Sequence, residues 1–307
     1  MMRILVVGAG ATGGYYGGRL AQAGRDVTFL VRGSRMRQLA EDGLHIFSRQ
    51  GDAKVEPKLM DAAGLASAGT FDLVLLSVKA YALESAIQDL RPAVGPNTVV
   101  LPVLNGMRHL DVLRQAFGPH RVMPGSVRIV ADLDEQGRIH QLTELDELVF
   151  GESGGDRSQR AESLLQELTV PGYTAKLSEN ISAALWRKWW ILATMGAVCV
   201  ISGGTVGDVA AVPNGPELAL AILGEAIAIA TANGYPPNPE FEREQKIRIT
   251  QPGSTLTSSM YRDMLKGAPV EADHILGDLL ARAHSTPAPL LTAAYVRLKV
   301  YEAKRAQ

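Results

Sequence analysis

The first half of the chain alternates short apolar strands with helices. Apolar runs bounded by turn residues are typical of buried strands. Strands are predicted at Ile4–Val7, Val27–Val31, Phe71–Val78 and Thr98–Leu101, and helices at Tyr15–Ala23, Ser34–Glu41 and Ala82–Leu90, with Ser34 as the cap of the second helix. Strands that alternate with helices predict a doubly wound parallel sheet of the Rossmann-like α/β class.

The stretch from Val122 to Phe150 has a different pattern, in which polar residues interrupt strand-like pieces. We expect additional, antiparallel sheet here that closes the first domain. A helix at Arg157–Leu168 and a last strand at Tyr173–Leu177 follow.

After Ser178 the strand patterns disappear and long helical patterns replace them. Clusters of proline and glycine separate these patterns, as they do between helices. Helices are predicted at Asn180–Ala197, Glu217–Asn233, Phe241–Ile249, Ser258–Lys266, Ala272–Ala283 and Pro289–Arg305. We therefore expect a Rossmann-like domain over residues 1–177 and an all-α domain over residues 178–307.

Composition bears on the classes of partner. A formal net charge of −1 gives no reason to expect nucleic acid or an anionic membrane surface as a partner. Cys199 is the single cysteine, so no internal disulfide forms, no metal site is predicted, and a reducing cytoplasm suits the chain. The longest apolar stretch, Trp189–Ile201, is shorter than the ~20 residues of a membrane span. It is interpreted as a core helix, with the interface of a homodimer as the open alternative.

A glycine-rich loop lies directly between the first strand and the first helix. It consists of Gly8, Ala9, Gly10, Ala11, Thr12 and Gly13. Glycines in this position let the backbone approach a pyrophosphate, and the helix that follows presents its free N–H groups to the phosphates. A strand–loop–helix context makes the pattern a dinucleotide-binding signature rather than a tight turn without a ligand.

The second strand indicates which dinucleotide binds. An NAD site usually has an acidic residue near the end of this strand, whereas here Arg32 follows Val31 and no carboxylate is present. A guanidinium, with Arg35 or Arg37 nearby, suits the 2′-phosphate of NADP(H), unless Arg32 is an ordinary surface charge.

Two further residues follow later strands of the predicted sheet. Lys79 comes after the third strand and Asn105 after the fourth. Ligands of doubly wound sheets lie at the carboxyl ends of the strands, so both residues are candidates for contact with cofactor or substrate. A surface lysine and an ordinary Asn-Gly turn are the alternatives.

Taken together, these segments resemble the ketopantoate reductase (2-dehydropantoate 2-reductase) family over nearly the whole chain. The resemblance rests on the glycine loop and on Leu30–Arg32, Val78–Ala80, Asn105–Met107, Leu185–Lys188, Thr257–Asp263 and Pro269–Asp273. It implies an all-α second domain like that of 6-phosphogluconate dehydrogenase. It also implies NADPH-dependent reduction of a 2-oxo acid, namely 2-dehydropantoate to pantoate in pantothenate and coenzyme A biosynthesis.

The resemblance assigns roles to single residues. Lys188 matches the lysine that protonates the alkoxide, and Glu271 matches the glutamate near that lysine and the cofactor. Asn105 matches a residue that contacts cofactor and substrate, and Ser259 matches one that binds substrate. Lys79 and, more loosely, the backbone of Ala131 match residues that contact the cofactor. Without the resemblance, Lys188 would be read as a surface lysine and Ser259 as a helix cap.

The chain departs from the family pattern where the substrate is bound. Leu192 and Gly196 stand where the family carries asparagines, one and two turns beyond Lys188. Leu192 is expected to form an apolar wall and Gly196 to leave space. The chain therefore binds 2-dehydropantoate differently or reduces a more apolar 2-oxo acid. A β-hydroxyacid dehydrogenase and a non-catalytic NADP-binding regulatory protein are the remaining alternatives.

Overall fold

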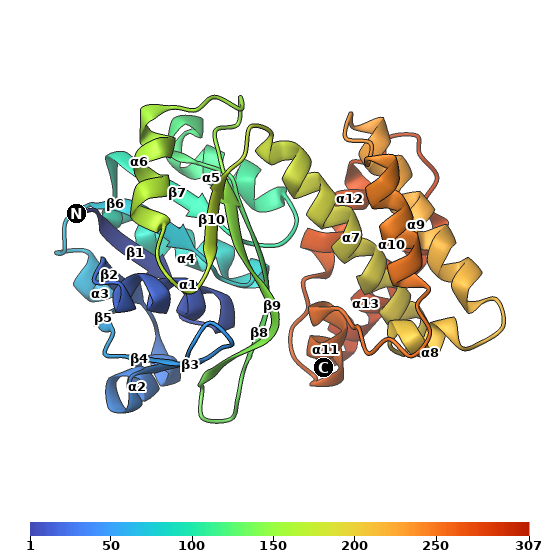
Figure 1. The fold of residues 1–307 in the computed structure, drawn as a ribbon, viewed down its shortest axis with the longest axis horizontal. Helices are drawn as coiled ribbons and strands as arrows, with labels where there is room; N and C mark the ends of the chain where they lie inside the picture. The colour runs from blue at the N-terminus through green and yellow to red at the C-terminus, as the bar shows by residue number, and fades with distance from the viewer. Residues whose placement is uncertain (307) are drawn as a thin grey trace. The chain divides into compact units, whose positions relative to one another are not determined.

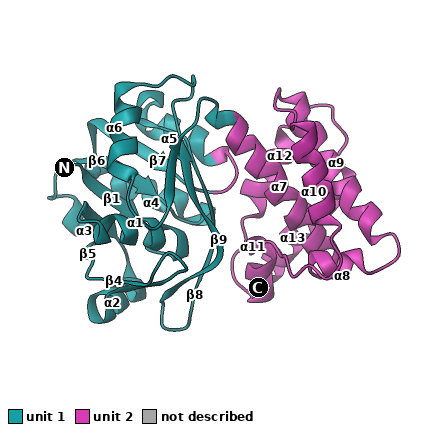
Figure 2. Cartoon of the chain, in the orientation of Figure 1, with its two compact units in different colours: residues 1–104, 109–182 teal, residues 105–108, 183–307 magenta. Residues whose placement is uncertain are grey.

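The computed structural model describes residues 1–306 and divides into two compact units. Unit 1 comprises residues 1–104 and 109–182, and unit 2 comprises residues 105–108 and 183–307 (Figure 2). The boundary predicted after residue 177 lies a few residues before this division. The short segment Asn105–Arg108 leaves unit 1 and joins unit 2, which the sequence pattern did not indicate.

A parallel five-stranded sheet forms the centre of unit 1 (Figure 1). Its strands are β1 (Arg3–Val7), β2 (Asp26–Leu30), β5 (Lys58–Met60), β6 (Phe71–Leu76) and β7 (Val94–Pro102), in the order β5-β2-β1-β6-β7. Every neighbouring pair is parallel. Strand order reverses beside β1, so the sheet is doubly wound as predicted, and the carboxyl end of β1 lies at the switch point where such sheets bind ligands.

The helices of unit 1 alternate along the chain with the strands of its two sheets. They are α1 (Ala11–Gln22), α2 (Gly33–Asp42), α3 (Ala62–Leu65), α4 (Leu83–Leu90), α5 (Arg108–Phe117) and α6 (Gln159–Leu168). The α1 helix begins inside the glycine loop, earlier than predicted. The prediction of Ser34 as a cap was wrong: α2 starts at Gly33, with Arg32 in the cap position and no side-chain cap bond.

A second sheet in unit 1 corresponds to the predicted additional sheet. It contains β3 (Leu44–Phe47), β4 (Ala53–Val55), β8 (Gly125–Leu133), β9 (Ile139–Phe150) and β10 (Thr174–Leu177). The β8–β9 pair is antiparallel, whereas β3 and β10 both pair with β9 in parallel. The β3–β4 hairpin was missed because its strands are very short.

Unit 2 is entirely helical in the part of the chain that the structure describes. Its elements are α7 (Ile181–Ser202), α8 (Val206–Ala210), α9 (Gly215–Ala232), α10 (Pro239–Ile249), α11 (Ser259–Leu265), a π-helical turn (Asp273–Gly277), α12 (Asp278–Ala281) and α13 (Pro289–Arg305). The α8 helix was not predicted, and the single helix expected at Ala272–Ala283 is split between the π turn and α12.

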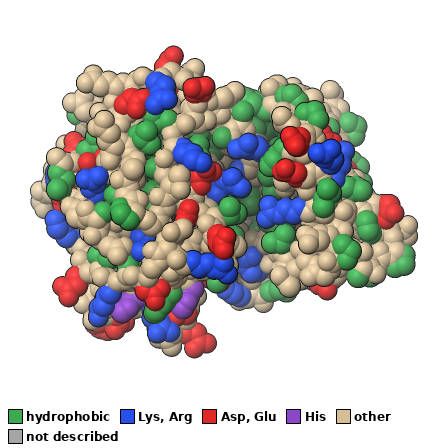
Figure 3. All heavy atoms as spheres, viewed as in Figure 1, with side chains coloured by type: hydrophobic (Ala, Val, Ile, Leu, Met, Phe, Trp, Pro, Cys, Tyr) green, Lys and Arg blue, Asp and Glu red, His purple; other side chains and the backbone are tan. Residues whose placement is uncertain are grey.

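The α7 helix is the centre of unit 2. Its side chains Trp186, Trp189 and Trp190 are at most 3% exposed and fill the core of this unit. At 22 residues α7 is longer than predicted, and α7 and α9 have the length and composition of membrane spans. The tryptophan packing identifies α7 as a core helix of a folded domain. On the face drawn in Figure 3, basic and acidic side chains are interspersed.

Candidate functional site

Close packing explains two of the three glycines in the loop after β1. Gly8 has a φ of +93°, and a Cβ placed there would stand 2.7 Å from the carbonyl oxygen of Ser77. A Cβ on Gly13 would stand 2.1 Å from the carbonyl oxygen of Gly8. The loop can therefore turn from strand to helix only with glycine at these positions.

The middle glycine faces open space. A Cβ on Gly10 would meet no heavy atom within 4 Å, and Gly10 occupies the N-cap of α1 without a side-chain cap bond. Gly10 therefore provides no side-chain cap for the N–H groups in the first turn of α1. A ligand can also approach the backbone at this point. This arrangement fits the pyrophosphate of a dinucleotide. The other loop residues, Ala9, Ala11 and Thr12, have small side chains.

Arg32, the predicted 2′-phosphate ligand, is held by helix α4. Its Nε donates to Asp89 Oδ2 at 2.8 Å, and its Nη2 donates to the same oxygen and to the carbonyl oxygen of Ser85 at 3.1 Å. The end of β2 thus has a carboxylate after all, brought from 57 residues further along the chain. Sequence reasoning missed Asp89 because no local pattern relates it to β2.

Arg35 contacts the glycine loop instead of extending the predicted phosphate site. Its Nε donates to the carbonyl oxygen of Ala9 at 2.7 Å, and its Nη1 donates to the carbonyl oxygen of Gly137 at 2.6 Å. Burial lowers the pKa of the Arg35 guanidinium. Arg35 therefore braces the loop against the turn between β8 and β9.

The remaining predicted residues of unit 1 lie on separate elements. Lys79 is exposed and follows β6, immediately before a 3₁₀ turn at Ala80–Ala82. Ala131 lies on β8, where the register with β9 shifts after Ile129. Such irregularities leave backbone groups outside the regular ladder, which suits the backbone contact predicted for Ala131.

In unit 2, Lys188 projects from α7 and is half-buried. Burial lowers the pKa of Lys188 to about 8, and the negative charge of Glu271 opposes this shift. Glu271 is itself only 5% exposed. The structure therefore places these two predicted residues in electrostatic contact, with an ammonium whose pKa lies close to neutral pH.

Asn105 joins the unit that contains Lys188 and Glu271. The next residue, Gly106, has a φ of +76°, and a Cβ there would stand 2.4 Å from the carbonyl oxygen of His274. His274 belongs to the π-helical turn that follows Glu271. Turns of this kind occur frequently at functional sites. Gly106 thus seats the Asn105 loop against the segment that carries Glu271.

The two serines at the start of α11 have different roles in the structure. Ser258 caps the helix, since its Oγ accepts the backbone N–H of Tyr261 at 3.0 Å. Ser259 is half-buried and is the first residue of the helix. The alternative role of Ser259 as a cap is therefore taken by its neighbour.

The expected space beside Gly196 is filled. A Cβ on Gly196 would stand 2.7 Å from the terminal methyl of Met260, so that flexible side chain occupies the room that the glycine leaves. Leu192 is half-buried one turn beyond Lys188, whereas Ala193 is fully buried. The prediction of space at Gly196 was therefore wrong, whereas the role of Leu192 as an apolar wall stays a prediction.

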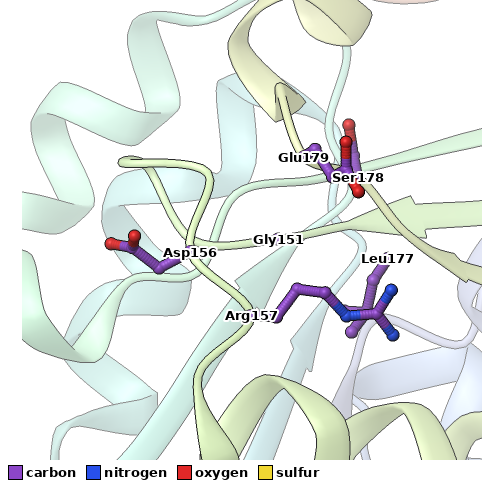
Figure 4. Close-up of a pocket in the computed structure, with 6 residues that line it drawn as sticks. All are labelled: Gly151, Asp156, Arg157, Leu177, Ser178 and Glu179. Atoms are coloured by element: carbon purple, nitrogen blue, oxygen red, sulfur yellow. The ribbon is translucent and has the colours of Figure 1, made fainter.

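None of these residues lines the cavity drawn in Figure 4. It has a volume of about 290 Å³ and is lined by Gly151, Asp156, Arg157, Leu177, Ser178 and Glu179. Arg157 is ion-paired with Glu162. Within residues 1–306, no group of three or more histidine, cysteine, aspartate and glutamate side chains is arranged to hold a metal.

A doubly wound sheet with a glycine loop at its switch point, followed by a helical unit with a lysine of lowered pKa, defines a two-domain oxidoreductase. The chain belongs to the ketopantoate reductase family. The family model "Ketopantoate reductase PanE/ApbA" matches residues 4–155, and its C-terminal counterpart matches residues 180–302.

Individual proteins and solved structures are similar to the chain over nearly its whole length. "Uncharacterized oxidoreductase YkpB" of Bacillus subtilis is 36% identical over 99% of this chain and 100% of its own length. The crystal structure of 2-dehydropantoate 2-reductase from Geobacter metallireducens is 26% identical, with a TM-score of 0.88 over 97% of this chain and 99% of that one. A D-mandelate dehydrogenase solved with NADH and anilino(oxo)acetate shares the fold, at 21% identity and a TM-score of 0.87 over 99% of both chains.

Proposed function

We propose that this protein reduces a 2-oxo acid to a 2-hydroxy acid with NADPH, and that the substrate is 2-dehydropantoate, the reaction yielding pantoate for pantothenate and coenzyme A biosynthesis. The observation that carries the proposal is Lys188, whose pKa of about 8 is set by burial and opposed by Glu271. An ammonium with such a pKa is charged at neutral pH and still releases its proton readily.

The phosphates of the cofactor are assigned to unit 1. Gly8–Gly13 would hold the pyrophosphate and Arg32 the 2′-phosphate. The family resemblance implies further cofactor contacts for Lys79, Asn105, Ala131 and Glu271. A bound nicotinamide dinucleotide supplies the hydride that adds to C2 of the substrate. The open face of Gly10 supports this assignment most directly.

Lys188 acts on the substrate oxygen. As C2 gains hydride, the carbonyl oxygen gains negative charge, which the Lys188 ammonium stabilises before it transfers a proton to that oxygen. The product is a hydroxyl group, and Lys188 is left neutral until it takes a proton from solvent. Glu271 keeps Lys188 charged beforehand, because its carboxylate raises the pKa of the lysine.

Asn105 and Ser259 are proposed to bind the substrate. Both offer neutral hydrogen-bond donors, which suit the carboxylate or a hydroxyl of a 2-oxo acid. We further propose that the protein is a soluble cytoplasmic enzyme whose partner is this small molecule. The tryptophans of the long apolar helix α7 are buried in the core of unit 2, which supports the proposal of a soluble protein.

A second candidate substrate class is a 2-oxo acid with an apolar branch. Leu192 offers no hydrogen bond to a substrate hydroxyl, and Met260 fills the room beside Gly196. A hydroxyl buried against such a surface without a partner binds poorly.

A steady-state assay of NADPH oxidation tests both candidates. 2-Dehydropantoate would be compared with branched, aromatic and pyruvate-like 2-oxo acids at equal enzyme concentration. The highest kcat/KM with 2-dehydropantoate supports the first substrate class, and the highest value with a branched or aromatic acid supports the second. Tight NADPH binding without oxidation by any of these acids would refute the proposed reaction and favour a regulatory protein.

A further inference from the structure

An ion pair occupies the position expected for the adenosine end of the dinucleotide. Arg32 follows β2, and its partner Asp89 lies on α4, which follows β6. The two strands flank β1, which carries the glycine loop. The backbone N–H of Gly8 also donates to the carbonyl oxygen of Leu30, so the end of β2 is joined directly to the loop. The pair therefore connects segments on both sides of the proposed pyrophosphate site.

The two members of this pair favour different cofactors. A guanidinium binds the 2′-phosphate of NADPH through charge-assisted hydrogen bonds. A carboxylate accepts a hydrogen bond from the 2′-hydroxyl of NADH and repels a phosphate. Here the guanidinium donates two hydrogen bonds to one carboxylate oxygen, so a 2′-phosphate must compete with Asp89 for Arg32.

Burial makes the carboxylate the more fixed of the two groups. The side chain of Asp89 is 19% exposed, whereas that of Arg32 is 54% exposed. Arg32 also donates to Ser85, through its Oγ at 3.3 Å and its carbonyl oxygen at 3.1 Å. The guanidinium is thus the more accessible of the two groups, and the carboxylate of Asp89 is the more buried.

We propose that Asp89 makes this site bind NADH as well as NADPH. The inference rests on the proposed function only in assigning a nicotinamide dinucleotide to the glycine loop. Arg32 would hold the phosphate of NADPH, and Asp89 would hold the ribose hydroxyl of NADH. Asp89 is therefore a specificity-determining residue, and it limits the preference for NADPH that Arg32 alone would give.

Equilibrium binding tests the inference without any turnover. Dissociation constants for NADPH and NADH would be measured by calorimetry for the native chain and for Asp89→Asn. We expect native constants within about tenfold of each other, and a further preference for NADPH of about tenfold in Asp89→Asn. Arg32→Gln should weaken NADPH binding by about tenfold and change NADH binding by less than about threefold.

One control and one further variant separate this effect from a general loss of stability. Asp26→Asn removes the carboxylate of the exposed Lys58–Asp26 ion pair, which lies at the opposite end of β2. It should leave both dissociation constants unchanged. Asp89→Ser is the second variant at the tested position, to be used if Asp89→Asn does not fold.

Binding of cofactor fragments distinguishes a failure of this inference from a failure of the proposed function. Adenosine 2′,5′-bisphosphate and adenosine 5′-monophosphate carry the adenosine end alone. An unchanged NADPH-to-NADH ratio in both Asp89 variants, or a native preference for NADPH above about a hundredfold, would overturn the inference alone. Failure of the native chain to bind any dinucleotide or fragment would overturn the proposed function as well. A chain that binds both cofactors and reduces no 2-oxo acid would support this inference and refute the proposed reaction.

Discussion

The glycine loop of unit 1 and the lysine region of unit 2 are built in opposite ways. The loop works through backbone: Gly8 and Gly13 allow close packing, and Gly10 leaves open space. The lysine region works through side chains, since burial and Glu271 together set the pKa of Lys188. Binding at the loop should therefore be sensitive to added atoms, and chemistry at the lysine should be sensitive to removed charge.

The largest effect is expected from removing that charge. Lys188→Met should lower kcat by about a hundredfold or more, because the proton donor is lost. Affinity for NADPH should change little, since the proposed phosphate ligands lie in unit 1. Stopped-flow or steady-state oxidation of NADPH measures the first effect, and calorimetry measures the second. Arg187→Met is the control, because Arg187 is the exposed neighbour that lies over the ring of Phe241. Turnover equal to that of the control would remove Lys188 from the mechanism.

An added methyl group in the glycine loop tests whether dinucleotide binding there is sensitive to added atoms. Gly10→Ala should fold normally, because its φ of −76° suits any residue and no atom lies near the added Cβ. The Cβ would occupy the room into which the pyrophosphate fits, so affinity for NADPH should fall by about tenfold or more. Gly224→Ala is the matched control, because a Cβ on Gly224 in α9 also meets nothing within 4 Å. Undiminished binding by Gly10→Ala would place the dinucleotide elsewhere.

Leu192 lies one turn beyond Lys188, where the family resemblance implies contact with the substrate. Leu192→Asn adds a hydrogen-bonding group one turn from the lysine. It should raise kcat/KM for 2-dehydropantoate relative to an unhydroxylated 2-oxo acid by about tenfold. The measurement is a competition assay with both acids present. Leu192→Met is the control, because it keeps the side chain apolar and should leave the ratio of the two kcat/KM values unchanged. The same ratio in Leu192→Asn and Leu192→Met would mean that residue 192 does not contact the substrate.

The smallest expected effect is a change in pH dependence. Glu271 raises the pKa of Lys188, so Glu271→Gln should lower that pKa further. In Glu271→Gln, kcat/KM should therefore begin to fall at a lower pH than in the native protein. The value of kcat/KM at low pH should change less than its value at high pH. A pH profile of both proteins measures the shift. Unchanged inflections would mean that Glu271 acts on structure and not on the charge of Lys188.

The difference between the glycine loop and the lysine region also explains which features could be predicted from the sequence. The parallel sheet and the glycine loop were recognisable because their signals are local: an apolar strand, three glycines and a helix follow one another. The helix at Pro289–Arg305 was likewise predicted with its observed bounds. The lysine region has no local signal. Lys188, Ser259 and Glu271 became candidates only through the family resemblance.

Three of the misses have a common physical cause, since each depends on a contact between distant parts of the chain. Asp89 reaches Arg32 across 57 residues, and Gly106 seats the Asn105 loop against His274. Met260 fills the room beside Gly196 from another helix. Ser34 failed as a cap for a more local reason, because the helix started one residue before it.

The most direct test of Lys188 as the proton donor is the pH dependence of kcat/KM for reduction by the native protein. Lys188 must be protonated to donate, and its pKa is lowered by burial to about 8. The rate should therefore be constant near neutral pH and fall by about tenfold per pH unit above that value. Lys188→Met should retain only a low rate without this inflection. A native profile that stays flat to well above pH 9 would contradict Lys188 as the proton donor.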